Sequence, residues 1–266
     1  MNNVLVLYLL FFLINFFGTL SYAARMVGVR TKMLALSFSL FNIINIISRT
    51  ANGFQTPFLA KYMESNFLAG VYNNPLPFFR SLLLISTAGC VAGTFFIPTT
   101  QRLFTQGVLY YNENRSLRKT ILKYFKKSSL KETRICFKTP SIKNFNHLTT
   151  LKGLPIKLFI YHCLGTAFIS IGVLSCIYAG FLEPQYRTTA SSLSFMVNGI
   201  AMVILFIFID PPLSAITDDS INGKITEPFF RKHLVWFLMA RIMGTILAQI
   251  ILIPIAKIIA QIALIM

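Results

Sequence analysis

Residues 33–60 read MLALSFSLFNIINIISRTANGFQTPFLA, a run long enough to cross a bilayer as a helix, in which Arg49 is the only charged residue. Placing a charge near the centre of a membrane helix costs about 3 kcal/mol on insertion scales, so such a residue usually faces a partner or a water-filled cavity. At spacings of three and four, one stripe of this helix holds Asn42, Asn45, Arg49, Asn52 and Thr56. The segment therefore predicts a membrane helix with a polar, cationic face.

The composition predicts an all-α, polytopic membrane protein. Hydrophobic residues make up 55% of the 266 residues and the mean hydropathy is +0.66, which is too apolar for an ordinary soluble domain. A bilayer core about 30 Å thick needs about 20 apolar residues per helix. Six runs meet this length, at 3–24, 33–60, 80–106, 156–182, 188–213 and 233–264. A membrane β-barrel is excluded, because its strands alternate apolar and polar residues and these runs are continuously apolar.

The positions of the basic residues predict the orientation of the spans. The chain carries 25 Lys and Arg against 8 Asp and Glu, and a net charge of +17 in a soluble protein would indicate nucleic acid binding. Here twelve basic residues lie between Arg115 and Lys157, and smaller basic groups occur at 25–32 and 224–232. Because basic loops stay in the cytoplasm, we expect both termini outside and no nucleic acid partner.

Three spans on each side of the basic connector divide the chain into a membrane half at 1–106, a cytoplasmic loop at 107–155 and a membrane half at 156–266. The two halves then have opposite orientations, which is the geometry of a 3+3 inverted repeat. Coincidence is the alternative, because the halves share only a short pattern of Ser, Asn and Gly. The connector either sets the topology alone or also collects an anionic lipid substrate.

The stripe around Arg49 suits an anionic head group that carries sugars. A guanidinium keeps its charge and offers a planar fork that matches phosphate oxygens. Asn side chains, such as those of Asn45 and Asn52, both donate and accept hydrogen bonds. The alternative is structural: Arg49 would bond to free backbone carbonyls and the asparagines would join helices.

The last span carries a second polar track. Arg241, Thr245, Gln249 and Lys257 follow one another along it at intervals of four or eight residues. If this track faces Arg49, cations are spread across the depth of the membrane, as the path of an anion requires. Otherwise Lys257 simply reaches the surface with its long side chain.

The first span and the loop after it hold further candidates. Arg25 and Arg30 lie at its predicted cytoplasmic end, where they could admit a phosphate or serve only as topology signals. Asn15, Thr19 and Tyr22 form a weaker polar line that we expect to face the same cavity.

Other intramembrane residues indicate structural roles. Gly89 and Gly93 predict a close helix contact. His162 indicates a hydrogen-bonded packing residue, and a proton relay is the alternative. Asp210, followed by Pro211 and Pro212, is expected to end the fifth helix and to form a salt bridge.

Motifs of common enzymes are missing from the sequence. There is no Walker-type phosphate loop, no paired His motif and no Gly-x-Ser-x-Gly elbow. Asp210 is the one acidic residue that approaches a predicted span, so a site with two carboxylates or a metal is hard to assemble there. We therefore expect no catalysis, no cofactor and no metal.

Residues 21–57, SYAARMVGVRTKMLALSFSLFNIINIISRTANGFQTP, resemble the Amj family of bacterial lipid II flippases, the alternate to MurJ. The resemblance lies in Tyr-x-x-Arg-x-x-Gly-Val-Arg-Thr, then Leu-Phe-Asn, then Ser-Arg-Thr-x-Asn-x-x-Gln-x-Pro. The length, the six spans and the large basic loop agree over the whole chain. The resemblance implies a protein of the bacterial cytoplasmic membrane that moves lipid II, an undecaprenyl-pyrophosphate-linked muropeptide, to the outer leaflet for peptidoglycan assembly.

Combined with this resemblance, the polar stripe gives a hypothesis for each candidate residue. Arg49 would bind the pyrophosphate, and Arg241, Arg25 and Arg30 would be successive stations, while the prenyl tail stays among the membrane lipids. Six helices enclose little volume for so large a head group, which leaves a homodimer open. The alternatives are a secondary transporter of another anionic or lipid-linked solute and a non-transporting envelope assembly factor.

Overall fold

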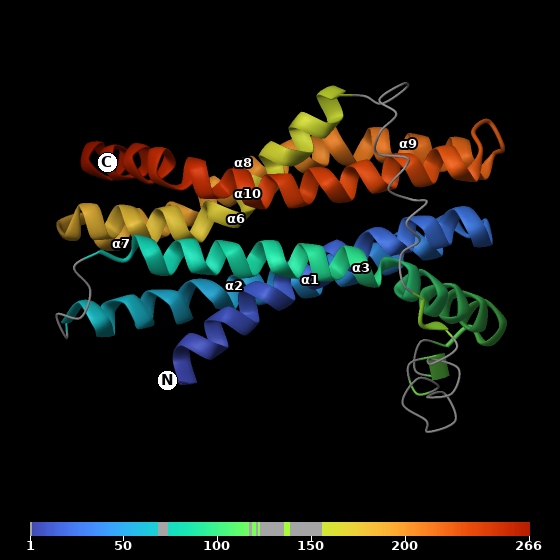
Figure 1. Ribbon diagram of the computed structural model, residues 1–266, viewed down its shortest axis with the longest axis horizontal. Helices are drawn as coiled ribbons and strands as arrows, with labels where there is room; N and C mark the ends of the chain where they lie inside the picture. The colour runs from blue at the N-terminus through green and yellow to red at the C-terminus, as the bar shows by residue number, and fades with distance from the viewer. Residues whose placement is uncertain (1, 69–73, 117–118, 121, 123–135, 139–155) are drawn as a thin grey trace.

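The computed structural model describes residues 2–68, 74–116, 119–120, 122, 136–138 and 156–266 (Figure 1). Within these ranges the regular elements are all helical, and six helical stretches are long and apolar enough to cross a membrane. The prediction of an all-α protein with six transmembrane helices is therefore confirmed. The side chain of Arg49 and most of the basic connector lie outside the described residues.

Five of the six crossings are single long helices. They are α1 (Asn2–Thr31), α2 (Leu34–Leu68), α3 (Leu76–Asn114), α6 (Ile156–Leu182) and α10 (Glu227–Ile265). Most extend beyond the predicted spans, because the apolar run reports only the part of a helix that needs the bilayer core. Their polar ends bring Glu64 and Glu227 onto membrane helices, so the expectation that Asp210 is the one acid near a span was wrong.

The fifth crossing is assembled from short elements. They are η2 (Pro184–Tyr186), α7 (Arg187–Ser192), α8 (Ser194–Val203), the π-helix η3 (Ile204–Ile209) and α9 (Asp210–Ile221). The expectation that Asp210, Pro211 and Pro212 end this helix was wrong. Both prolines lie in the first turn of α9, where a missing backbone N–H is tolerated, and the wider π-turn accommodates the carbonyls before them.

The helices pack as two groups that meet along the middle of the molecule. In the first group α1 lies between α2 and α3, and in the second α6 packs against α10 and the fifth crossing. Contacts between the groups join α3 to α10 and α1 to α9, whereas α2 has little contact with the second group. This arrangement is compatible with two structural halves, and an inverted repeat remains a prediction.

Glycines bring neighbouring helices close together, as predicted. A Cβ atom added to Gly93 would lie 2.8 Å from Cβ of Thr19 and 3.0 Å from the Phe16 carbonyl oxygen, both on α1. In the second helix group, a Cβ atom added to Gly244 of α10 would lie 2.6 Å from the Cys163 carbonyl oxygen on α6. Gly89 and Gly93 therefore form a close contact of α3 with α1.

The two ends of the molecule differ in character. At the basic end the α1–α2 and α9–α10 turns lie with Arg30, Lys32, Lys224, Arg231 and Lys232. At the far end lie the α2 C-terminus, the α3 N-terminus and the C-terminus of the chain (Figure 1). A large apolar cluster fills the far half and includes Phe11, Leu59, Phe79, Ile171 and Leu174. That the basic end is cytoplasmic remains a prediction.

Candidate functional site

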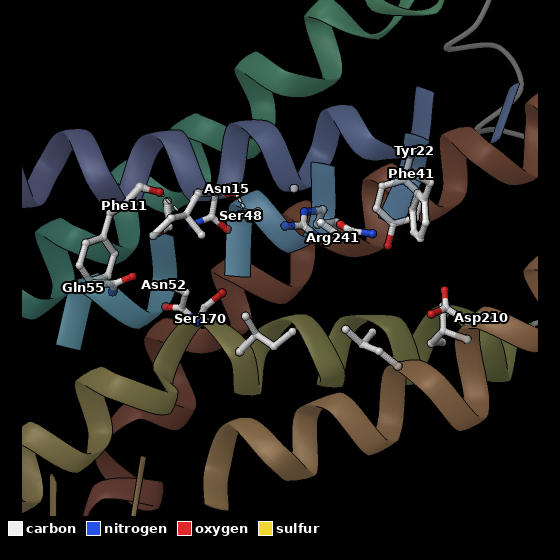
Figure 2. Close-up of a pocket in the computed structure, with 17 residues that line it drawn as sticks. Phe11, Asn15, Tyr22, Phe41, Ser48, Asn52, Gln55, Ser170, Asp210 and Arg241 are labelled. Carbon is white, nitrogen blue, oxygen red and sulfur yellow. Dashed lines mark hydrogen bonds between the residues drawn. The ribbon is translucent and has the colours of Figure 1, made fainter. Parts of the chain in front are cut away.

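A cavity of about 80 Å³, here the central cavity, lies between the two helix groups. Side chains from α1, α2, α3, α6, α10 and the fifth crossing line it. Figure 2 shows Arg241 near its middle, polar side chains on one side of Arg241, and Tyr22, Phe41 and Asp210 on the other. Among the described residues, the cavity thus combines the Arg241 cation and the Asp210 carboxylate with a wall of amides and hydroxyls.

The polar face of α2 forms much of this wall. Its lining residues are Phe41, Asn45, Ser48, Asn52 and Gln55, spaced by four, three, four and three residues. This stripe shares Asn45 and Asn52 with the predicted one and is otherwise rotated by one position. Asn42 is exposed and Thr56 is half-buried, and neither lines the cavity. Arg49 follows Ser48 in the helix, but its side chain is not described.

Arg241 reaches the cavity from α10. Its Nε donates a hydrogen bond to Oγ1 of Thr19 at 3.0 Å, and Thr19 Oγ1 in turn donates to the Asn15 carbonyl oxygen at 2.7 Å. The guanidinium lies against Gly18, where any Cβ atom would meet Nη2 of Arg241. In the described part of the chain no carboxylate forms an ion pair with Arg241. The predicted residues Asn15, Thr19 and Arg241 therefore come together.

Tyr22 and His162 join the two groups beside Arg241. The Tyr22 hydroxyl and Nε2 of His162 lie 2.9 Å apart, and both side chains are buried. Ring contacts to Phe41 and Phe237 surround this pair. The hydrogen bond fits the packing role expected for His162.

Arg25 has an internal partner at the basic side of the cavity. Its Nη2 donates to Oδ1 of Asp210 at 2.9 Å, and its Nη1 donates to Oγ of Ser214 at 3.1 Å. The guanidinium also lies 4.5 Å from the centroid of the Phe41 ring. The salt bridge expected for Asp210 is confirmed. Its partner is Arg25, which is one of the arginines predicted to bind phosphate.

The other predicted cations and polar residues lie apart from the cavity. Arg30 forms an ion pair with Glu227 at 3.2 Å near the basic end. Gln249 donates to the Arg80 carbonyl oxygen at 3.0 Å, so it faces α3, and Lys257 is exposed. Thr245 is buried and bonds to its own helix. The polar residues of α10 therefore do not share one environment: Arg241 faces the cavity, whereas Thr245, Gln249 and Lys257 do not.

Two further cavities continue the central one along α2. The basic-end cavity, of about 420 Å³, is lined by residues that include Arg25, Leu34, Phe38, Ser214 and Thr217. The far-end cavity, of about 160 Å³, is lined by residues that include Ala60, Glu64, Ile177, Arg187 and Ser191. α2 therefore contributes to all three cavities in turn, at 34–38, 41–55 and 60–64.

Several lining residues were missed by the sequence analysis. Ser48 and Gln55 could have been found, because they lie three residues from Asn45 and Asn52 and so share a face with them. Ser86, Ser170 and Asp210 line the cavity from α3, α6 and α9, and their role depends on which helix faces meet.

The sequence profile of the Amj family, described as Alternate to MurJ, matches residues 10–263 of the chain. The chain belongs to the Amj family. It is also 35% identical over 260 residues to the lipid II flippase Amj of Bacillus subtilis (strain 168), covering 95% of this chain and 94% of the relative. No solved structure matches the chain significantly. As an Amj family member with six transmembrane helices, it is a multi-pass protein of a bacterial membrane.

Within the described ranges, no three His, Cys, Asp or Glu side chains cluster so as to hold a metal ion. The described lining of the central cavity offers hydrogen-bond donors and acceptors, the Asp210 carboxylate and the Arg241 guanidinium, and the guanidinium can bind an anion.

Proposed function

We propose that this Amj protein is a lipid II flippase, which moves the undecaprenyl-pyrophosphate-linked muropeptide from the inner to the outer leaflet of the bacterial cytoplasmic membrane. The observation that carries the proposal is the 35% identity, over nearly the whole of both chains, to a lipid II flippase. The central cavity supports it independently, because it holds a membrane arginine among amides and hydroxyls. On this proposal the protein carries out no catalysis.

Arg241 is the first candidate to bind the pyrophosphate. It lines the cavity, its Nε is held by Thr19, and it forms no ion pair with a carboxylate of the described residues. A guanidinium so held can present two parallel N–H groups to a phosphate. Asn45, Asn52 and Asn15 surround it with groups that can hydrogen-bond to sugars and phosphate.

The other arginines extend the path. Arg49 is assigned to the same region of α2, because its position is one turn from Asn45 and from Asn52. Arg25 and Arg30 are assigned to loading at the basic end, where each would exchange its acidic partner for the substrate. Outward movement of a negative head group is assisted by an inside-negative potential, by about 2.3 kcal/mol per charge per 100 mV.

Transport requires the central cavity to widen. At about 80 Å³ it has room for a few water molecules, whereas pockets for drug-sized ligands occupy about 300–1,000 Å³. α2 is the helix that can move most easily, because it has little contact with the second group. Its separation from α6 and η3 would admit the head group and leave the prenyl tail among the membrane lipids.

The test is a leaflet-accessibility assay for lipid II in reconstituted vesicles. We expect Arg241→Ala to slow translocation at least tenfold, because the pyrophosphate loses its fork. Lys257→Ala, which removes an exposed cation from the same helix, should match the wild type. Arg49→Ala should likewise abolish rescue of flippase-depleted cells by a protein that still inserts and folds.

The outcomes separate this function from its alternatives. Wild-type transport rates in both Arg241→Ala and Arg49→Ala would refute the assigned binding site. Movement of other lipid-linked sugars, with none of lipid II, would indicate a carrier for another solute. No movement of any substrate by well-folded protein would indicate a non-transporting assembly factor.

A further inference from the structure

A single layer of residues separates the central cavity from the basic-end cavity. On α1 the lining passes from Tyr22 to Arg25, and on α9 it passes from Asp210 to Ser214. On α2 the central cavity begins at Phe41, and the basic-end cavity reaches Phe38. On each helix the two linings are one turn apart, so the barrier between the cavities is about one turn thick.

An ion pair forms the centre of this barrier. Nη2 of Arg25 and Oδ1 of Asp210 lie 2.9 Å apart, and the pair joins α1 of the first group to α9 of the second. The Arg25 side chain is 2% exposed, whereas that of Asp210 is 27% exposed. Because Asp210 lines the central cavity, its carboxylate has space to turn away from Arg25.

The guanidinium of Arg25 is only partly satisfied by these contacts. Its Nη atoms bond to Asp210 and Ser214, but its buried Nε has no hydrogen-bond partner. Oγ of Ser37, which lines the basic-end cavity, is likewise buried without a partner. An anion with several oxygens could therefore satisfy more donors here than the single Asp210 oxygen does.

The helix that carries Asp210 is built to bend beside it. The π-helix η3 ends at Ile209, and Pro211 and Pro212 remove two backbone donors immediately after Asp210. Pro and π-turns are the usual sites of bending in long helices. A change in angle at this point would move α9, with Asp210, relative to Arg25.

The barrier on the other side of the central cavity is thicker and apolar. The linings of the central and far-end cavities are separated on α6 from Ser170 to Ile177, or about two turns, and on α2 from Gln55 to Ala60, or about one and a half turns. Ile171 and Leu174 fill this interval as members of the far apolar cluster. The central cavity is therefore closed by one polar layer toward the basic end and by a deeper apolar layer toward the far end.

On the basis of the proposed lipid II transport, we infer that Arg25 and Asp210 form the gate at the basic end and that the pyrophosphate opens it by replacing Asp210 on Arg25. The exchange keeps the buried guanidinium of Arg25 paired with an anion throughout, while the released Asp210 carboxylate, which is 27% exposed, turns toward the central cavity. Asp210 is thus a positioning residue that holds Arg25 until substrate arrives.

The gate can be tested by thiol modification without any transport assay. Ser170→Cys places a near-isosteric thiol on the wall of the central cavity, and an anionic methanethiosulfonate is added to the basic-end side of reconstituted vesicles. Modification is measured at position 170 by mass spectrometry, which separates it from the four native cysteines. In this background we expect Asp210→Asn to raise the modification rate at least tenfold, because the ion pair is lost.

Matched variants control for general loosening. Asp219→Asn, on the same helix as Asp210, breaks the exposed pair with Lys224 in the turn after α9 and should leave the rate unchanged. Asp210→Glu and the double exchange Arg25→Asp with Asp210→Arg retain opposite charges and should stay close to the wild-type rate. Equal rates in Asp210→Asn and the wild type would overturn the gate, as would a double exchange that is as fast as Asp210→Asn.

A binding measurement tests the exchange of partners. Purified Asp210→Asn protein should bind lipid II at least fivefold more tightly than the wild type, because Arg25 is free of its competitor, and Arg25→Gln should bind it more weakly. Unchanged affinity in both variants would overturn the exchange. If the wild type neither binds nor moves lipid II, the proposed function fails, while the thiol rates still decide whether the ion pair closes the cavity.

Discussion

At the scale of single residues, the central cavity depends on a side chain that is missing. Gly18 on α1 leaves the space in which the guanidinium of Arg241 lies, and Thr19 next to it holds Nε. Arg241 and Thr19 could be predicted from the sequence, because polar residues are conspicuous in apolar spans. The role of Gly18 could not be predicted, because a glycine in a sequence does not indicate which side chain lies against it.

Replacement of Gly18 tests this arrangement. In Gly18→Ala the new methyl group would displace the guanidinium, which can move because it is the end of a flexible side chain. We expect lipid II translocation to fall about tenfold with no loss of thermal stability, since Ala favours a helix over Gly by about 1 kcal/mol. Gly53→Ala is the control, because nothing lies within 4 Å of the added Cβ atom. Similar translocation in the two variants would argue against a role for the position of Arg241.

At the scale of helices, apolar runs and helix geometry explain what could be predicted. The spans and the existence of a polar face on α2 could be predicted in this way. Which residues of that face line the cavity could not, because residues one position apart lie only about 100° apart around a helix. The fifth crossing was mispredicted at Asp210 for a similar reason. Whether Pro-Pro ends a helix or begins its next turn depends on whether a π-turn can form before it.

The contact of α3 with α1 gives a prediction at this scale. Gly93→Leu would drive a side chain into Thr19 and the Phe16 carbonyl, and such overpacking typically costs about 1–3 kcal/mol. We expect a lower melting temperature of the purified protein and, because Thr19 holds Arg241, slower transport as well. At Gly199 no atom lies within 4 Å of an added Cβ atom, so the Gly199→Leu variant should melt near the wild-type temperature. Equal melting temperatures would show that the close approach is not required.

At the scale of the whole molecule, the positions of the basic residues predict the orientation of the helices in the membrane, and the fold is compatible with that orientation. The basic turns of α1–α2 and α9–α10 lie together at one end, as a single cytoplasmic face requires. The row of cavities along α2 was beyond prediction, because it arises where faces of helices distant in sequence meet. The same limit applies to a homodimer, which remains a prediction.

Impermeant thiol reagents can test the orientation. Asn74→Cys lies at the far end and Lys224→Cys at the basic end, and both positions are exposed. In right-side-out vesicles we expect a charged maleimide to modify only the Asn74→Cys variant, and in inverted vesicles only the Lys224→Cys variant. The native cysteines provide a low background, because Cys90, Cys136 and Cys176 are buried and Cys163 is partly so. The reverse pattern would place both termini in the cytoplasm.

The apolar layer beyond the central cavity has a consequence for the energy balance of the cell. The path of a pyrophosphate through a membrane protein must be hydrated and lined by cations. Protons and chloride ions can cross the membrane along such a path as well. In the part of the chain that the structure describes, aliphatic side chains of α6 such as Ile171, Leu174 and Ile177 fill the interval between the central and far-end cavities. A membrane containing many copies would therefore keep its proton gradient, and leakage would be confined to the moments of transport.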